Sequence, residues 1–120
     1  MMNFQEYQEA QQSTAVYNSV MYPFGSIAEE AGEVMGKINK YVRKEDVDYE
    51  DAILGSAEPM DTVSAKLRYD LLKELGDVLW QVSACASELN IDLELIAQLN
   101  LCKTKNRAVR GTLNGEGDDR

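Results

Sequence analysis

The fold is decided by residues 66–89, KLRYDLLKELGDVLWQVSACASEL. Apolar side chains recur in this stretch at intervals of three and four residues, the spacing of one face of an α-helix. They are Leu67, Leu71, Leu75, Val78, Val82, Ala86 (or Cys85) and Leu89. This periodicity, the strongest in the chain, predicts one long helix that Asp61 or Thr62 can cap. Asn90 is expected to end it, because asparagine tolerates the left-handed backbone conformation.

Three weaker patterns predict the remaining helices. They comprise residues 3–18, a helix that begins near Pro23 or Ser26 and ends near Arg43 or Lys44, and a helix that follows a cap at Asp92 and ends near Val109. No stretch alternates apolar and polar residues as a half-buried strand does. We therefore expect an all-α protein, a four-helix bundle that is completed by oligomerisation.

The length and composition predict a single domain. A chain of 120 residues with 44% apolar residues can bury one core. We place the helical domain at residues 1–110 and interpret residues 45–65 as an acidic, partly irregular connection with one short turn around residues 49–54. The glycine-rich tail, residues 111–120, has too few apolar residues to pack alone. It closes over a bound ligand, reaches a neighbouring subunit, or ends disordered.

The composition also excludes several classes of function. A net charge of −9 argues against nucleic-acid binding, which depends on Lys and Arg. No apolar run reaches the roughly 20 residues of a membrane span, and no secretory signal is visible, so we expect a cytoplasmic protein. Cys85 and Cys102 lie in apolar helical patterns and are expected to be buried, reduced thiols. The absence of histidine excludes Ser–His–Asp triads and histidine zinc sites.

Two matching motifs carry the candidate chemistry. They are Glu30-Ala31-Gly32-Glu33 and Glu74-Leu75-Gly76-Asp77, each a carboxylate, an apolar residue, a glycine and a carboxylate. Residues three apart lie on neighbouring turns of one helix face. If the two helices face each other, four carboxylates converge, and all-oxygen ligation favours Mg²⁺ or Mn²⁺. A glycine inside a helix costs about 1 kcal/mol, so Gly32 and Gly76 suggest a close approach to the backbone. A single such acid would be interpreted as an exposed helix acid.

Basic and polar residues suggest where phosphates would bind. Lys37 and Lys40 continue the face of Glu30 and Glu33, and Asn100, Lys103 and Arg107 share one face of the last helix. Lys and Arg neutralise the phosphate oxygens that cations leave free, although a solvated helix face is the alternative in each case. Trp80 follows Asp77 by three residues and can stack on a base or lie in the core, and Tyr7 and Tyr17 are comparable candidates for a base pocket.

These residues resemble a known family. Glu29-Glu30-x-x-Glu33 followed by Glu74-x-x-Asp77 is similar to the EExxE…ExxD signature of the MazG-like all-α nucleoside triphosphate pyrophosphohydrolases. The resemblance extends to Lys73–Trp80, Asn100-x-x-Lys103 and the closing Gly111-Thr112-x-x-Gly115-x-Gly117-Asp118-x-Arg120, and it leaves out residues 45–66, where this connection is longer than in many relatives. It points to small single-domain members from a bacterial cell or a phage-infected host.

The resemblance implies an activity and a division of roles. The family converts a (d)NTP to the (d)NMP and pyrophosphate with Mg²⁺ or Mn²⁺, here with one to three ions per site. Carried over, Glu30, Glu33, Glu74 and Asp77 would be the metal ligands. Glu29 points about 100° away from Glu30 around the helix. It is therefore expected to have an auxiliary role, in which it orients or deprotonates a water molecule.

Further expectations concern substrate and assembly. The partner is a small-molecule nucleoside triphosphate, and we favour a deoxynucleotide with dGTP as the working choice. Removal of non-standard nucleotides is the competing purpose. The relatives form dimers or dimers of dimers, so we expect a homodimer or homotetramer. The alternative from another class is a non-catalytic helical module that binds a nucleotide or a protein partner.

Overall fold

Five α-helices form the described part of the chain, which in this computed structural model comprises residues 1–111 and 117. They are α1 (Phe4–Ser13), α2 (Tyr22–Glu45), α3 (Tyr49–Ala57), α4 (Thr62–Glu88) and α5 (Leu93–Arg110). No strand occurs among these residues, so the all-α prediction is confirmed. None of the helices described is both long and apolar enough to span a membrane.

The helix ends follow local capping chemistry. The Asp61 side chain accepts a hydrogen bond from the Ser64 amide at 2.7 Å and begins α4, as predicted. Asn90, just beyond α4, has a φ of 58°, the left-handed conformation expected of it. Pro23 lies in the first turn of α2. Asp92 stands at the cap position of α5 but makes no side-chain capping bond.

Two helices differ from the sequence-based expectation. The first ends at Ser13 rather than near residue 18, where the Thr14 amide bonds to the Gln11 carbonyl, three residues back instead of four. The connection at residues 45–65 contains the complete helix α3. Asp48 caps its start by accepting from the Asp51 amide, and the Arg68 guanidinium, from α4, donates to the Ala57 carbonyl at its end.

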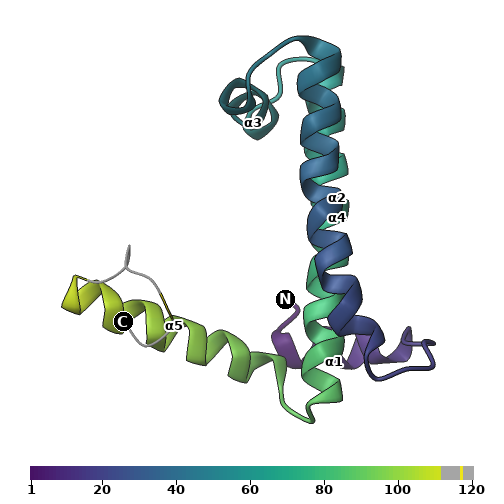
Figure 1. Ribbon diagram of the computed structural model, residues 1–120, viewed down its shortest axis with the longest axis vertical. Helices are drawn as coiled ribbons and strands as arrows, with labels where there is room; N and C mark the ends of the chain where they lie inside the picture. The colour runs from purple at the N-terminus through teal and green to yellow at the C-terminus, as the bar shows by residue number, and fades with distance from the viewer. Residues whose placement is uncertain (112–116, 118–120) are drawn as a thin grey trace.

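The architecture is an open hairpin rather than a closed bundle. The long helices α2 and α4 lie side by side and antiparallel, with α3 at one end and α1 and α5 at the other (Figure 1). Helix α5 packs on α1 and α4 and does not reach α2. The radius of gyration is 17.3 Å, against about 14 Å for a compact domain of this length.

The buried core is correspondingly small. It is formed by Ile38, Ala52, Leu67, Ala84, Cys85, Ala86 and Leu93. The prediction that the whole stripe of α4 points inward is wrong at Leu75 and Leu89, which are 53% and 60% exposed, because no other part of the described chain covers them. Cys102 of α5, which was expected to be buried, is exposed for the same reason, as are Leu95 and Leu99 on the same helix. Cys85 is buried as expected, and both thiols are free.

Candidate metal centre

Three carboxylates from the two long helices converge at one place. One oxygen from each of Glu30 on α2 and Glu74 and Asp77 on α4 lies within 4.8 Å of the others. Glu30 and Glu74 are half-buried and Asp77 is exposed, so the cluster opens to solvent. The two α4 acids are one turn apart, and the antiparallel packing of α2 against α4 brings Glu30 to them. This is the convergence that the paired motifs predict, for three of the four acids.

The other two acids of the motif lie at the edge of this cluster. Glu29 and Glu33 are exposed and stand outside the group of three, on neighbouring positions of α2. Their charges still act on it. Partial burial raises the pKa of Glu30, and the charges of Asp77, Glu29, Glu33 and Glu74 raise it further. The crowded negative charge and the all-oxygen donor set fit a divalent cation such as Mg²⁺ or Mn²⁺.

One predicted phosphate ligand already contacts the cluster. The Lys37 ammonium lies 3.5 Å from a carboxylate oxygen of Glu74, and the Lys37 side chain is 39% exposed. Lys40 lies three residues further along α2, and no carboxylate of the described residues comes within ion-pair distance of it. The face that runs from Glu30 towards these lysines is therefore continuous along α2.

The polar residues of α5 are not brought to this cluster within one chain. Asn100 is exposed, Lys103 is half-buried and Arg107 is buried. Arg107 donates from Nη2 to the Gly117 carbonyl at 3.3 Å. Because α5 does not contact α2, these three side chains and the Glu30 carboxylate belong to separate parts of the molecule.

The aromatic candidates separate into two groups. Trp80 donates from Nε1 to the Thr14 hydroxyl at 2.9 Å, and its ring meets the edge of Tyr17 at 6.2 Å. The Tyr17 hydroxyl donates to a Glu88 carboxylate oxygen at 2.6 Å, and burial together with this bond raises the pKa of Tyr17 to about 12. The Trp80 ring of α4 therefore packs against the segment that follows α1, to which Tyr17 belongs.

Tyr7 is the aromatic residue close to the acids. Partial burial raises its pKa, and the charge of Asp77 adds to the effect. A groove of about 420 Å³ lies beside it, lined by Met2, Asn3, Phe4, Tyr7 and Leu79. The sequence reasoning missed Phe4 and Leu79 as lining residues. The spacing of Phe4 three residues before Tyr7 was the available signal.

The two motif glycines face open space within the chain. A Cβ atom added at Gly32 or Gly76 would meet nothing within 4 Å. The close approach that these glycines suggested is therefore not made by any described part of this chain. Only a bound ligand or a second copy of the chain could make such an approach.

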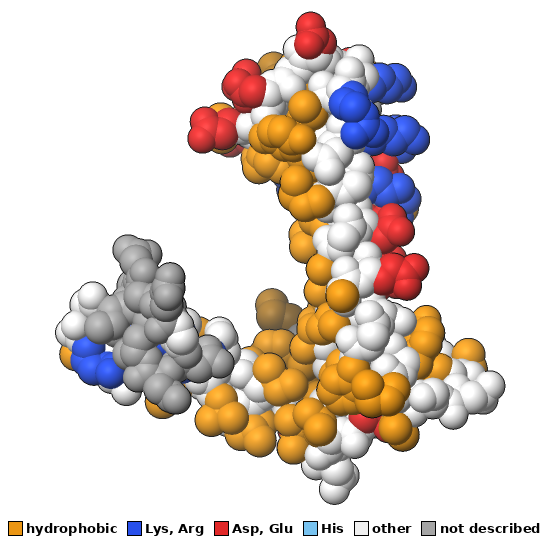
Figure 2. All heavy atoms as spheres, in the orientation of Figure 1, with side chains coloured by type: hydrophobic (Ala, Val, Ile, Leu, Met, Phe, Trp, Pro, Cys, Tyr) orange, Lys and Arg blue, Asp and Glu red, His pale blue; other side chains and the backbone are white. Residues whose placement is uncertain are grey.

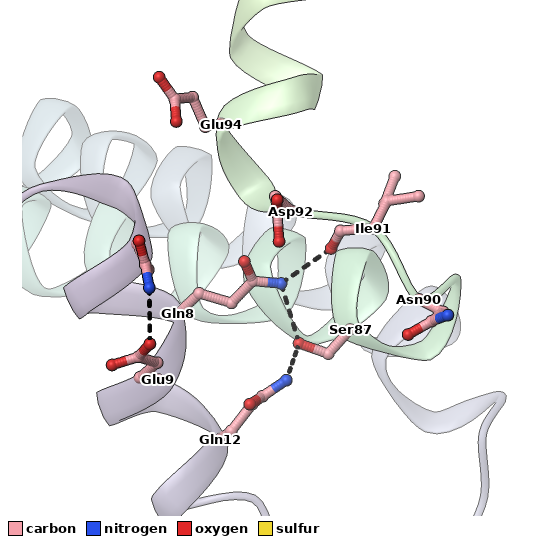
Figure 3. A pocket seen from close by; sticks show the side chains of 9 residues that line it. Gln8, Glu9, Gln12, Ser87, Asn90, Ile91, Asp92 and Glu94 are labelled. Atoms are coloured by element: carbon pink, nitrogen blue, oxygen red, sulfur yellow. Dashed lines mark hydrogen bonds between the residues drawn. The ribbon is translucent and has the colours of Figure 1, made fainter.

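A separate, polar pocket of about 360 Å³ lies between α1 and the turn that joins α4 to α5 (Figure 3). The amide groups of its glutamine side chains are already bonded to the protein. The Gln8 side chain donates to the Ser87 hydroxyl and to the Ile91 carbonyl, and it accepts from the Leu93 amide at 2.8 Å. Gln12 also donates to Ser87. We interpret this pocket as a structural joint, distinct from the acidic cluster.

Comparisons with known proteins agree with the geometry. Residues 24–110 match the model of the MazG nucleotide pyrophosphohydrolase domain. The chain is 31% identical to the Gene 37 protein of Mycobacterium phage L5 over 128 residues, which cover 99% of this chain and 100% of that protein. No solved structure matches the chain. The matched region contains α2 and α4 with all three converging carboxylates. The chain therefore belongs to the MazG nucleotide pyrophosphohydrolase domain family.

Proposed function

We propose that this protein hydrolyses a nucleoside triphosphate between its α and β phosphates. The oxygen of a water molecule bonds to the α-phosphorus, the bond from that phosphorus to the bridging oxygen breaks, and the products are a nucleoside monophosphate and pyrophosphate. The observation that carries the proposal is the convergence of Glu30, Glu74 and Asp77 within a MazG domain.

The residues present fit a divalent cation, and their roles follow from position. Glu30, Glu74 and Asp77 would hold one or more Mg²⁺ or Mn²⁺ ions, with Glu33 joining from the edge. When bound, such ions offset charge on the phosphate oxygens and acidify water. Glu29 lies outside the group of three, where it can orient water and accept its proton. With no histidine in the chain, a carboxylate is the natural proton acceptor.

Basic residues on both sides of the cluster would bind the phosphates. Lys37 can exchange Glu74 for a phosphate oxygen, and Lys40 continues the same face. We propose that Asn100, Lys103 and Arg107 act on a site of a second copy, because α5 does not reach α2 of its own chain. This arrangement makes a homodimer or homotetramer the active form.

The base would lie near the start of α1. The groove lined by Phe4, Tyr7 and Leu79 offers an apolar surface for a flat ring, and Tyr7 is close enough to Asp77 for that charge to raise its pKa. Trp80 is a second stacking candidate, provided that its bond to Thr14 opens. For the substrate we favour a deoxynucleotide, with dGTP as the first to be tried.

The proposal is tested by measuring pyrophosphate release from the eight common NTPs and dNTPs. Separate reactions contain Mg²⁺, Mn²⁺ or EDTA, and chromatography identifies the second product. We expect metal-dependent release of pyrophosphate and a nucleoside monophosphate. Release of inorganic phosphate with a nucleoside diphosphate would contradict the cleavage position. Absence of hydrolysis with every nucleotide would favour a non-catalytic binding module.

Glu74→Gln is the variant that tests the site. It removes one metal-binding charge and keeps the side-chain shape, so activity should fall at least a hundredfold, about 2.7 kcal/mol of barrier. Glu50→Gln on α3, which removes an exposed carboxylate far along the chain from the motif, is the matched control and should leave activity unchanged. Near-normal turnover by Glu74→Gln would refute the assignment.

A further inference from the structure

A groove between α2 and α4 lies directly beside the acidic cluster and has the opposite charge. It encloses about 180 Å³ and is lined by Lys37, Lys40, Tyr41, Lys44, Glu45, Val63, Lys66, Leu67 and Asp70. Four lysines thus face two carboxylates, in a chain whose net charge is −9. Figure 2 shows Lys and Arg side chains gathered at the α3 end of the hairpin, on the edge that faces away from α3, beyond acidic side chains on the same edge. We call this feature the lysine groove.

Helix stability does not explain where these lysines stand. Cations are favourable in the last turn of a helix, which accounts for Lys44 at the end of α2. Lys37 and Lys40 lie before that turn. Lys66 is the fifth residue of α4, close to the end where the helix dipole disfavours a cation. Its pair with Asp70 also places the lysine N-terminal to the acid, the weaker of the two orders.

The carboxylates in the groove leave much of its positive charge uncompensated. Asp70 contacts both Lys66, at 2.7 Å, and Lys73, at 3.3 Å, and the Lys66 bond holds the pKa of Asp70 below its ordinary value. Lys40 and Lys44 have no carboxylate of the described residues within 4.0 Å. Two ammonium groups are thus available to an anion from solution.

The length of the groove indicates the shape of that anion. Lys37 contacts Glu74 of the acidic cluster, so the groove begins where the cluster ends. From Glu30 to Lys44, α2 rises about 21 Å. A phosphate chain that starts at the cluster would meet Lys37 first and then Lys40. Lys44 and Lys66 lie further on and would face the next phosphates of a longer chain.

We propose that the lysine groove binds a linear phosphate chain of more than three phosphates. The ligand is either an inorganic oligophosphate or the tail of a nucleoside tetraphosphate. The second case rests on the proposed function: water attack at the α-phosphorus of a nucleoside tetraphosphate would break its bond to the bridging oxygen and release the nucleoside monophosphate and inorganic triphosphate.

Binding is tested first without metal and without turnover. Calorimetry measures the affinity of the intact protein for inorganic pyrophosphate and inorganic tetraphosphate. The wild type should bind tetraphosphate more tightly. Lys44→Gln should weaken tetraphosphate binding about threefold, and Lys44→Gln with Lys66→Gln about tenfold, the sizes expected of one and two exposed charge contacts. Pyrophosphate, which spans fewer of the lysines, should lose less affinity than tetraphosphate in both variants.

The matched control is Arg43→Gln. Arg43 is the exposed neighbour of Lys44 on α2, carries the same charge and does not line the groove. It should leave both affinities unchanged. Equal weakening by Arg43→Gln, or equal affinity of the wild type for the two anions, would overturn the proposal. Circular dichroism confirms that each variant retains the helical fold.

Two sources of the ligand are then distinguished by kinetics. If the nucleoside tetraphosphate is the source, its kcat/KM should exceed that of the matching triphosphate, and Lys44→Gln should remove the advantage while leaving triphosphate hydrolysis unchanged. If kcat/KM does not differ, the tail assignment is wrong and binding by calorimetry assigns the groove to inorganic oligophosphate. Absence of triphosphate hydrolysis would refute the proposed function. The calorimetric result would still show whether the lysine groove binds a phosphate chain.

Discussion

Glu30 is the residue of the acidic cluster whose pKa the neighbouring carboxylates raise. Its pKa is raised, first by partial burial and then by four neighbouring carboxylates. Between the unfolded pKa of 4.5 and the higher folded pKa, the folded state binds more protons than the unfolded state. The free energy of unfolding therefore falls as pH rises through this window, and the loss is complete once the pH lies well above the folded pKa.

Glu30→Gln should consequently stabilise the metal-free protein. We expect a higher melting temperature than the wild type at pH 7 and the same melting temperature near pH 4, where the wild-type carboxyl is protonated. Added Mg²⁺ should raise the melting temperature of the wild type and raise that of the variant much less, because one ligand is lost. A variant that melts lower than the wild type at pH 7 would contradict this account of the cluster.

Gln8 joins α1 to the turn between α4 and α5. It is buried, and its amide satisfies the Ile91 carbonyl and the Leu93 amide (Figure 3). Gln8→Ala leaves both backbone groups without this partner, and we expect a loss of about 2–3 kcal/mol in the free energy of unfolding. Urea denaturation at fixed protein concentration measures it. Gln5→Ala, at an exposed position of the same helix, should change stability by less than about 0.5 kcal/mol.

At the scale of the element, the two long helices contain glycines that the chain itself does not require. A Cβ at Gly76 or at Gly36 would meet nothing within 4 Å. Gly76→Ala and Gly36→Ala should each raise helix stability by about 0.5–1 kcal/mol, measured by thermal unfolding. Activity distinguishes them: only Gly76 lies inside the acidic motif, so only Gly76→Ala should lower kcat/KM. Full activity in Gly76→Ala would show that no ligand approaches the backbone there.

The helix ends show how much of an element can be predicted from a few residues. Asp61 and Asn90 bound α4 through interactions with their own neighbours in sequence, so both were predictable. The sequence predicts only a short turn where the complete helix α3 forms, because residues far along the chain also stabilise this helix. Ala52 is buried against the hairpin, and Arg68 of α4 caps its end.

At the scale of the whole molecule, the hairpin leaves an apolar stripe uncovered on α4. Leu72, Leu75 and Leu79 are 58%, 53% and 40% exposed and recur at three and four residues. Apolar side chains are also visible along the length of the hairpin in Figure 2. An exposed apolar surface of this kind is typical of a protein interface, and we propose that a second copy of the chain covers it.

Light scattering should therefore give a mass of two or four chains of 13.4 kDa. Leu72→Lys places a charge in the stripe and should shift the mass to that of one chain at micromolar concentration. Met60→Lys, at a position 94% exposed between α3 and α4, is the control and should leave the assembly intact. A monomeric wild type would refute the interface and the assignment of Asn100, Lys103 and Arg107 to a neighbouring site.

The sequence by itself determined the all-α class, the bounds of α4 and the pairing of the acidic motifs, because helix periodicity, capping and motif spacing act over a few residues. Only the tertiary structure decided that Glu33 stands outside the trio of Glu30, Glu74 and Asp77, and that Gln8 rather than Asp92 bonds the first amide of α5. It also showed that Leu75 is exposed and that α5 lies away from α2. These outcomes depend on which helices pack together, a property of contacts between residues far apart in the sequence.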